Sequence, residues 1–329
     1  MTTTPQLRPM SLGDMFDAAF KLYRQNFLTF VGIVALLQVP MAIVQFLVQY
    51  TLGNRALQNW MRFATRAGAI RPGENPFAAF PFGDLVTVFA ISLVLAVVQY
   101  LIVRNLVTGA LANAIGRLYN GQPVSILESY SFGARRFLAL IGASLATFFI
   151  GALVTGLIFG CMFGSMFALV GGSGNRGGGV VAAILIVLVM IGLFVLLGLA
   201  AMYVYTRLMV TTQAIVLEDQ GPLAGLGRSW RLIGGSFWRS LGVLVLMGIL
   251  TYMIAQFPGT IVSFALTLAS RNALDNLIVN QIITTLLVQI GEVVALPLQL
   301  AIYTLLYFDL RIRKEGYDLE LIAQQAASA

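Results

Sequence analysis

Glu292 is the one carboxylate that lies well inside an apolar stretch of this sequence, near the middle of residues 277–310. A charged group at that depth in a membrane is costly, so it marks either a pathway or a buried polar contact. Glutamines follow helical spacing along one side of the same stretch, and a comparable row lies in the first apolar stretch. These further intramembrane polar candidates are Gln281, Gln289, Gln299, Gln38 and Gln45.

Two interpretations of these polar residues remain open. In one, Glu292 responds to protons or cations on a polar path through the membrane. In the other, the glutamines and Glu292 form a hydrogen-bonded network that joins helices. The depth and neighbours of Glu292 decide between them.

Groups that could catalyse a reaction are scarce. The chain has no histidine, which is the commonest general base and metal ligand. Its other carboxylates are scattered at helix ends, and lysine occurs only at Lys21 and Lys314. Cys161 is the single cysteine, so there is no disulfide framework. We therefore expect no enzymatic activity, no metal site and no cofactor.

Long apolar segments must position the polar residues. Hydrophobic residues make up 59% of the 329 residues and charged residues 10%, which excludes an ordinary water-soluble core. Six stretches approach or exceed the roughly 20 residues that a helix needs to cross hydrocarbon. We predict an all-α, polytopic membrane protein with six transmembrane helices in a single membrane domain, residues 1–329. The stretches cover residues 27–50, 85–103, 137–170, 180–210, 237–269 and 277–310.

Aromatic and glycine positions recur along the chain. Phe27, Phe137 and Phe237 each open an apolar stretch, and they are separated by 110 and then 100 residues. An aromatic precedes each by seven residues and a glycine follows each by five. Such spacing indicates a repeated supersecondary unit. We predict three units, each an interfacial amphipathic helix plus a transmembrane hairpin, at about 11–120, 121–220 and 221–316, with a short cytoplasmic tail at 317–329.

An amphipathic segment precedes the first apolar stretch of each unit. Ser125 and Glu128 have the spacing of a capping box, and Pro222 suits the first turn of a helix. Such helices can lie in the membrane interface, where they either pack on the protein or contact anionic head groups. The candidate head-group contacts are Lys21, Arg24, Arg135, Arg136, Arg228 and Arg231.

Small residues recur at four-residue intervals in the third apolar stretch, at Gly156, Gly160 and Gly164. They form one smooth helix face that another backbone can approach closely. We expect a helix contact within the chain at this face. An oligomer interface and a pore lining remain open as alternatives.

Basic residues gather in the segments that share a side of the membrane with both chain ends. Because Lys and Arg near membrane ends resist translocation, both termini are predicted to be cytoplasmic. The net charge of +7 sits at helix ends, where anionic lipid is a nearer partner than nucleic acid. We expect membrane lipids as partners and no nucleic acid, with a homo-oligomer or an unidentified membrane protein partner left open.

Two terminal motifs carry a resemblance to a known family. They are Ser11-Leu-Gly-Asp-Met-Phe-Asp17 with Tyr23-Arg-Gln-Asn-Phe27, and residues 307–320, YFDLRIRKEGYDLE. They resemble the bacterial membrane-domain family named after glycerophosphoryl diester phosphodiesterases, in its stand-alone membrane part. The resemblance implies a multi-pass protein of the bacterial plasma (inner) membrane. It carries over no catalytic residue, because that enzymatic part depends on histidines and a metal.

These observations predict a non-enzymatic integral membrane protein, an accessory or scaffold module that contacts anionic lipids. The alternative is a transporter or channel for a small solute or ion that uses a polar intramembrane path with Glu292. The alternative requires a continuous polar cavity that reaches this carboxylate.

Overall fold

The computed structural model describes residues 10–67, 80–119, 121–171, 179–269 and 273–316. These residues form helices joined by short turns, and the described part of the chain has no strand, which confirms the all-α class. The predicted cytoplasmic tail, residues 317–329, lies outside the described residues.

Six helical rods in the described chain are long and apolar enough to cross a membrane, as predicted. Three of them contain a π-helical turn, the element in which one extra residue widens the helix. The rods with such a turn are α2 (Phe27–Val48), η1 (Gln49–Gly53) and α3 (Asn54–Ala67); α4 (Phe82–Val98), η2 (Gln99–Val103) and α5 (Arg104–Tyr119); and α11 (Phe237–Thr251), η4 (Tyr252–Gln256) and α12 (Phe257–Ala269). The others are α7 (Phe137–Gly171), α8 (Gly179–Leu208) and α13 (Ala273–Glu315).

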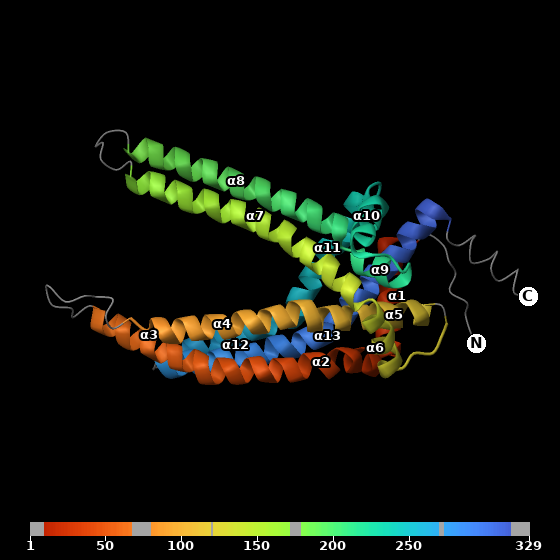
Figure 1. Ribbon diagram of the computed structural model, residues 1–329, viewed down its shortest axis with the longest axis horizontal. Coiled ribbons are helices and arrows are strands. Elements are labelled where there is room, and N and C mark those ends of the chain that lie inside the picture. The colour runs from red at the N-terminus through yellow and green to blue at the C-terminus, as the bar shows by residue number, and fades with distance from the viewer. Residues whose placement is uncertain (1–9, 68–79, 120, 172–178, 270–272, 317–329) are drawn as a thin grey trace, which may run out of the picture.

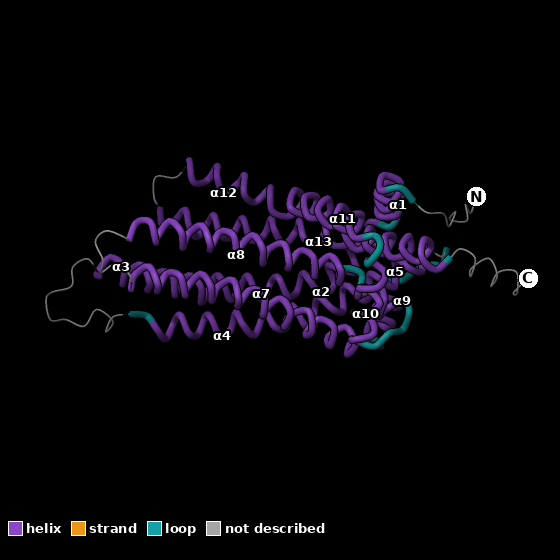
Figure 2. The backbone as a smooth tube through the Cα atoms, turned by 90° about the horizontal axis from the view of Figure 1, so that it is seen from above, coloured by secondary structure: helices purple, strands orange, loops and turns teal. Residues whose placement is uncertain are grey.

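The rods are arranged as a V (Figure 1). One arm is the α7–α8 hairpin, and the other, which we call the main arm, contains α2, α3, α4, α12 and the first part of α13. The arms meet at one end, where short helices gather (Figure 2). The short helices are α1 (Leu12–Gln25), α6 (Ile126–Arg135), α9 (Thr211–Leu217) and α10 (Pro222–Ile233). We call these four helices, together with α5 and residues 295–315 of α13, the end cap.

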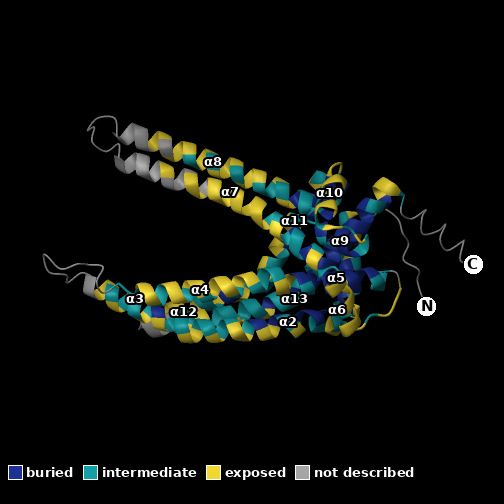
Figure 3. Ribbon diagram, viewed as in Figure 1, coloured by how far each residue is buried: buried dark blue, intermediate teal, exposed yellow. Residues whose placement is uncertain are grey.

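Most of the buried core lies in the end cap and extends into α2 at Phe30, Ile33, Val34 and Met41, whereas the arms carry many exposed apolar side chains (Figure 3). Residues 107–116 of α5 and 300–310 of α13 are all buried. In the arms, the helices satisfy their own backbone hydrogen bonds, and lipid is as apolar as leucine. Exposed apolar faces on the arms are therefore what a membrane environment requires.

The short helices begin with the local signals that the sequence offers. Ser11 caps α1 in a full capping box, because its hydroxyl accepts from the Asp14 amide and its own amide donates to the Asp14 carboxylate, both at 3.1 Å. The box predicted at Ser125 forms only in part. The Ser125 hydroxyl accepts from the Glu128 amide at 3.3 Å, but the Glu128 carboxylate pairs with Arg117 instead.

The short helices α1, α6 and α10 pack on different partners in the end cap. Helix α6 packs on α5, where Gly133 faces the backbone of Gly109 and Ala110. Helix α10 packs on α9, where Gly225 faces Ile215. Helix α1 packs on the end of α13, the last helix of the described chain. The first and last described helices therefore lie together in the end cap.

Candidate functional site

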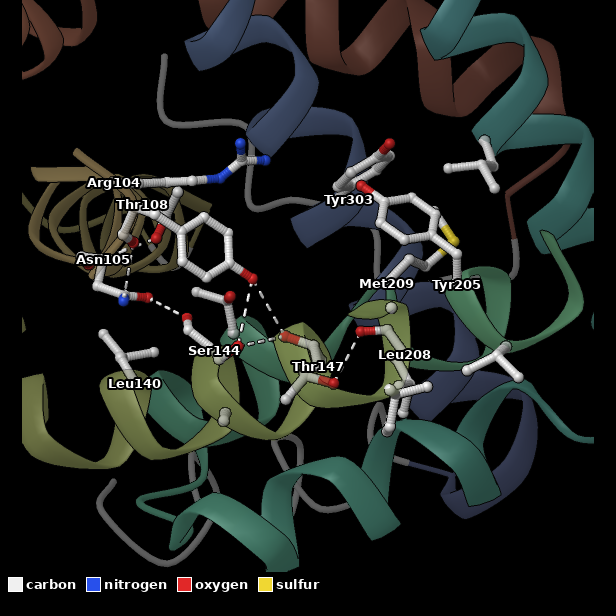
Figure 4. Close-up of a pocket in the computed structure, with 18 of the residues that line it drawn as sticks. Arg104, Asn105, Thr108, Leu140, Ser144, Thr147, Tyr205, Leu208, Met209 and Tyr303 are labelled. Carbon is white, nitrogen blue, oxygen red and sulfur yellow. Dashed lines mark hydrogen bonds between the residues drawn. The ribbon is translucent and has the colours of Figure 1, made fainter. Parts of the chain in front are cut away.

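A cavity of about 720 Å³ lies where the two arms meet the end cap (Figure 4). Its walls come from η2 and α5 on one side, α7, α8 and α9 on another, and α13 on a third. The lining mixes hydroxyl, amide and apolar side chains. It contains one charged residue, Arg104, and no carboxylate in the part of the chain that the structure describes.

Arg104 is the first residue of α5 and follows the π-helical turn η2 directly. The Asn105 side-chain amide donates to the carbonyls of Tyr100 at 3.3 Å and Leu101 at 3.0 Å, within this turn. Figure 4 shows the Arg104 side chain reaching across the cavity toward α13. Its guanidinium has no ion-pair or hydrogen-bond partner among the described residues, although it belongs to a rod long enough to span a membrane.

The wall formed by η2, α5 and α7 is tied together by its own polar groups. The Tyr100 hydroxyl donates to the Ser144 carbonyl at 3.2 Å, and the Ser144 hydroxyl donates to the Asn105 side-chain oxygen at 2.7 Å. Thr147 donates back to the Ser144 carbonyl at 2.9 Å. These bonds fix the start of the α7–α8 arm to the second rod.

The opposite wall presents hydroxyl groups that can still donate. The Gln299 amide donates to the Tyr303 hydroxyl at 3.0 Å, which leaves the Tyr303 proton free for another acceptor. The Tyr205 ring lies beside Tyr303 in Figure 4. Together with Arg104, these hydroxyls make this side of the cavity a set of hydrogen-bond donors that suits an anion.

Gln213 of α9 belongs to the cavity wall and is fully buried. Neither its side-chain oxygen nor its nitrogen has a hydrogen-bond partner in the described structure. Buried polar atoms without a partner are uncommon and costly. The amide group of Gln213 in the cavity wall can therefore still donate and accept hydrogen bonds.

Comparison with known proteins places the chain in a family. The chain belongs to the family described as domain of unknown function (DUF7847). The match covers residues 10–310, which is nearly all of the described helices. No curated protein and no solved structure matches this DUF7847 chain. The resemblance to the membrane domains named after glycerophosphoryl diester phosphodiesterases stays a prediction.

The glutamines predicted as intramembrane polar residues take different places in the DUF7847 fold. Gln299 lines the cavity, whereas Gln281 lines a second, much smaller hollow beside Gln49. The Gln289 amide donates to Gln45 at 3.1 Å and so joins α13 to α2. The Gln99 amide donates to Gln38 at 3.0 Å and so joins η2 to α2. Most of this row therefore links helices of the main arm.

Glu292 is half-buried on α13 and is not among the residues that line the cavity. Arg104 is the cation whose charge acts on it. The continuous polar cavity to Glu292, which the transport alternative requires, is not found in the described structure. The arrangement of the glutamines resembles the helix-joining network more than a path.

Some of the predicted head-group contacts have a carboxylate partner within the described chain, and the others do not. Lys21, Arg24, Arg135 and Arg231 are exposed and have no carboxylate partner in the described chain. Arg136 pairs with Asp219. Arg228 pairs with Glu218 at 2.7 Å and with Glu315, so its charge is used inside the end cap and not at the surface.

The glycine row of α7 has no partner helix, contrary to the contact expected within the chain. A Cβ atom placed on Gly156, Gly160 or Gly164 would meet nothing within 4 Å. The reason is the V shape, because the α7–α8 arm diverges from the main arm at this level (Figure 1). The face is open in the described structure.

The sequence did not predict the ion pairs inside the end cap. Asp309 is fully buried, pairs with Arg239 at 3.1 Å and Arg313 at 2.9 Å, and accepts from the Met10 amide at 2.8 Å. Glu218 accepts from Arg228 and from the Tyr307 hydroxyl. Arg313 is only four residues from Asp309, but Arg239 and Met10 are 70 and 299 residues from it, and Tyr307 is 89 residues from Glu218, so local spacing gives no sign of these distant partners.

Proposed function

We propose that this protein is a non-enzymatic membrane module that binds an anionic lipid, with the lipid head group in the cavity between the two arms. The observation that carries the proposal is Arg104. An unpaired guanidinium within a membrane-spanning rod is costly unless water or an anion meets it. The lining of the Arg104 cavity offers further donors and no carboxylate among the described residues, and Glu292, on which the Arg104 charge acts, forms no ion pair with it, so an anionic group is the ligand that the Arg104 charge favours.

The surroundings of the cavity favour a lipid over a soluble anion. Apolar residues of α7, α11 and α13, such as Ile150, Leu244 and Leu296, share the lining with the polar groups. Beyond the cavity, the two arms of the V carry exposed apolar side chains. A ligand with a charged head and apolar chains matches both environments.

The scaffold role rests on the proposed threefold repeat. Positions at the predicted repeat spacing are buried in all three amphipathic short helices: Ala19, Ser129 and Ser229 form one set. Each of these helices is followed by a rod that starts at Phe27, Phe137 or Phe237. The packing of α1 on α13, α6 on α5 and α10 on α9 supports three similar units joined in the end cap.

We place the end cap on the cytoplasmic side of a bacterial plasma membrane, with the amphipathic short helices in the interface. The concentration of arginine and lysine at this end supports that orientation. It puts both ends of the described chain in the cytoplasm. Labelling from outside the cell that reached residues of α1 would contradict it.

The test of the proposed lipid site compares Arg104→Gln with Arg62→Gln. Arg62 is an exposed arginine of α3, far from the cavity, so it is a matched control for the loss of one charge. Purified protein is placed in nanodiscs that contain phosphatidylglycerol and phosphatidylcholine, and retained lipid is counted by native mass spectrometry. Losing a charged hydrogen-bond partner should weaken retention of the anionic lipid roughly tenfold to a hundredfold for Arg104→Gln.

Arg62→Gln should retain the anionic lipid as the wild-type protein does. Phosphatidylcholine retention should not change in either variant. If Arg104→Gln holds as much phosphatidylglycerol as the wild type, the cavity is not the lipid site.

A further inference from the structure

The basic residues at the end cap fall into two groups. Arg117, Arg136, Arg228, Arg239, Arg311 and Arg313 each have a carboxylate partner. Lys21, Arg24, Arg104, Arg135, Arg207, Arg231 and Lys314 have none in the described chain. Three of them, Arg207, Arg231 and Lys314, come from α8, α10 and α13. Arg207 and Lys314 donate to backbone carbonyls of α10 beside the turn that joins α10 to α11, and Arg231 supplies one of these carbonyls. We call Arg207, Arg231 and Lys314 the basic corner.

Two glycines of this turn lie directly against the cations. A Cβ atom on Gly234 would stand 2.9 Å from the Arg207 Nη1, and one on Gly235 would stand 3.4 Å from the Lys314 Nζ. Arg207 donates to the Trp230 carbonyl and Lys314 to the Arg231 carbonyl, both at 3.1 Å. Bonds to successive carbonyls at the end of α10 thus hold both cations beside the turn.

Capping of α10 accounts for only part of this arrangement. Cations near the last carbonyls of a helix stabilise its negative end. Arg207 uses three N–H groups, on the Trp230 carbonyl and the Tyr203 hydroxyl, and Lys314 uses one. A guanidinium has five donors and an ammonium three, so donors remain on both. Cations gathered without an acidic partner repel one another unless an anion joins them.

Aromatic side chains surround the basic corner. The Arg207 guanidinium lies 5.1 Å from the Tyr203 ring centre and 5.0 Å from that of Trp230. Trp238, at the start of α11, is 81% exposed. Two of the three tryptophans of the chain are therefore at this corner. Tryptophan and tyrosine concentrate at the depth of lipid head groups, which indicates where the corner lies in the membrane.

We propose that the basic corner is a second binding site, for the phosphate of an anionic lipid head group at the membrane surface. Arg207 and Lys314 supply the charged donors, the glycine turn leaves room beside them, and the aromatic rings hold Arg207 in place. The site is separate from the cavity, because none of its three cations lines that cavity.

Tryptophan fluorescence provides the test. Trp60→Phe removes the tryptophan of α3, so that emission reports Trp230 and Trp238 at the corner. The protein in zwitterionic detergent is titrated with short-chain phosphatidylglycerol, phosphatidylcholine or inorganic phosphate. Phosphatidylglycerol should give a saturable change. Arg207→Gln combined with Lys314→Gln should weaken it roughly 30-fold, from the loss of two surface charges.

Three further variants distinguish lipid binding at the corner from a general effect of charge and from binding in the cavity. Lys21→Gln with Arg24→Gln removes two unpaired charges from α1 and should keep the wild-type affinity. Arg104→Gln should also keep it, which separates this site from the cavity. Arg207→Lys with Lys314→Arg preserves both charges and should bind as the wild type does.

Four outcomes would overturn the proposal. The first is an unchanged titration for Arg207→Gln with Lys314→Gln, and the second is an equal response to phosphatidylcholine. The third is saturation by inorganic phosphate without lipid, which would assign the corner to free phosphate. The fourth is a loss of binding both in Arg207→Gln with Lys314→Gln and in Arg207→Lys with Lys314→Arg, together with a lower unfolding temperature. That result would mean that the two cations only cap the C-terminal end of α10.

Discussion

The end cap and the α7–α8 arm are both helical and apolar, but different contacts hold them. In the end cap, long runs of α5 and α13 are buried, and ion pairs link α9, α10, α11 and α13. The arm buries little of its own surface. Of the most apolar segment of each rod, 0% of the residues are buried in the α8 rod, against 39% in the α13 rod. The end cap is stabilised by the protein itself, whereas the arm depends on surrounding lipid.

The cavity lies at the boundary between these two regions. One wall belongs to α5 and α13, which are fixed by burial in the end cap. Another belongs to α7 and α8, which are held near their cap ends by bonds such as Tyr100 to Ser144. A binding site with one fixed wall and one weakly supported wall can admit a bulky ligand without unfolding the core.

The test with the largest expected effect removes one carboxylate from the end cap and one from the main arm, outside the end cap. Asp309→Ala leaves Arg239, which is largely buried, without its carboxylate partner. Breaking a buried pair in this way costs about 3–5 kcal/mol of unfolding free energy. Asp84→Ala removes a pair with Arg55 in the main arm at 3.6 Å, where Arg55 is 71% exposed, and a hydrogen bond from the Asn59 amide, and should cost about 1–2 kcal/mol.

Denaturant or thermal unfolding in detergent, followed by circular dichroism, measures both losses. Asp84→Ala is the matched control, because it makes the same chemical change in a pair whose arginine is exposed to solvent. Equal losses for the two variants would mean that the end cap is not where the protein is stabilised.

The sequence predicted where the helices lie and begin better than it predicted which face of each helix contacts the rest of the protein. Amphipathic periodicity and capping residues located α1, α6 and α10, and the six apolar stretches located the spanning rods. It could not tell which face of a uniformly apolar helix meets protein, because lipid and protein select the same side chains. For that reason the contact predicted at the Gly156, Gly160 and Gly164 face is wrong for the described structure.

The candidate site was predictable only in part. Gln299 is among the predicted polar residues, and Arg104 stands out as a cation after an apolar stretch whose helix pattern continues beyond it. The cavity itself depends on how η2, α7, α8 and α13 come together, which no local pattern encodes. The same holds for Asp309, whose partner Met10 is 299 residues away.

A second test compares glycines in the two regions. A Cβ atom on Gly133 would stand 2.9 Å from the Ala110 nitrogen, a backbone atom that cannot move aside cheaply. Gly133→Ala should force α6 away from α5 and destabilise the protein by about 1–3 kcal/mol. Gly160→Ala meets nothing within 4 Å and should be neutral or stabilise the helix by up to about 1 kcal/mol.

The unfolding midpoints of Gly133→Ala and Gly160→Ala, each compared with the wild type, measure these two effects. A loss for Gly160→Ala comparable to that of Gly133→Ala would show that the glycine face of α7 is covered, for example by a second copy of the chain. Chemical cross-linking of the wild-type protein in membranes would then identify that neighbour.

The smallest expected effect is on the response to acid. Burial raises the pKa of Glu218, but hydrogen bonds from Arg228 and Tyr307 and the charges of Arg228 and Arg311 outweigh it, so the pKa is lowered overall. A carboxylate with a lowered folded-state pKa adds stability above its unfolded pKa, roughly 4.3, and this stability is lost as the pH falls through the folded value. Acid should therefore loosen the end cap.

Tryptophan emission can compare the end cap with the main arm during acidification. Trp230 and Trp238 report the end cap, and Trp60 reports the main arm, so Trp60→Phe isolates the former and Trp230→Phe with Trp238→Phe isolates the latter. The end-cap signal should change first as the pH falls. Glu218→Gln should lower stability at neutral pH by on the order of 1 kcal/mol, since Glu315 still pairs with Arg228. It should also flatten the acid dependence, and an unchanged acid profile would show that another carboxylate controls the response.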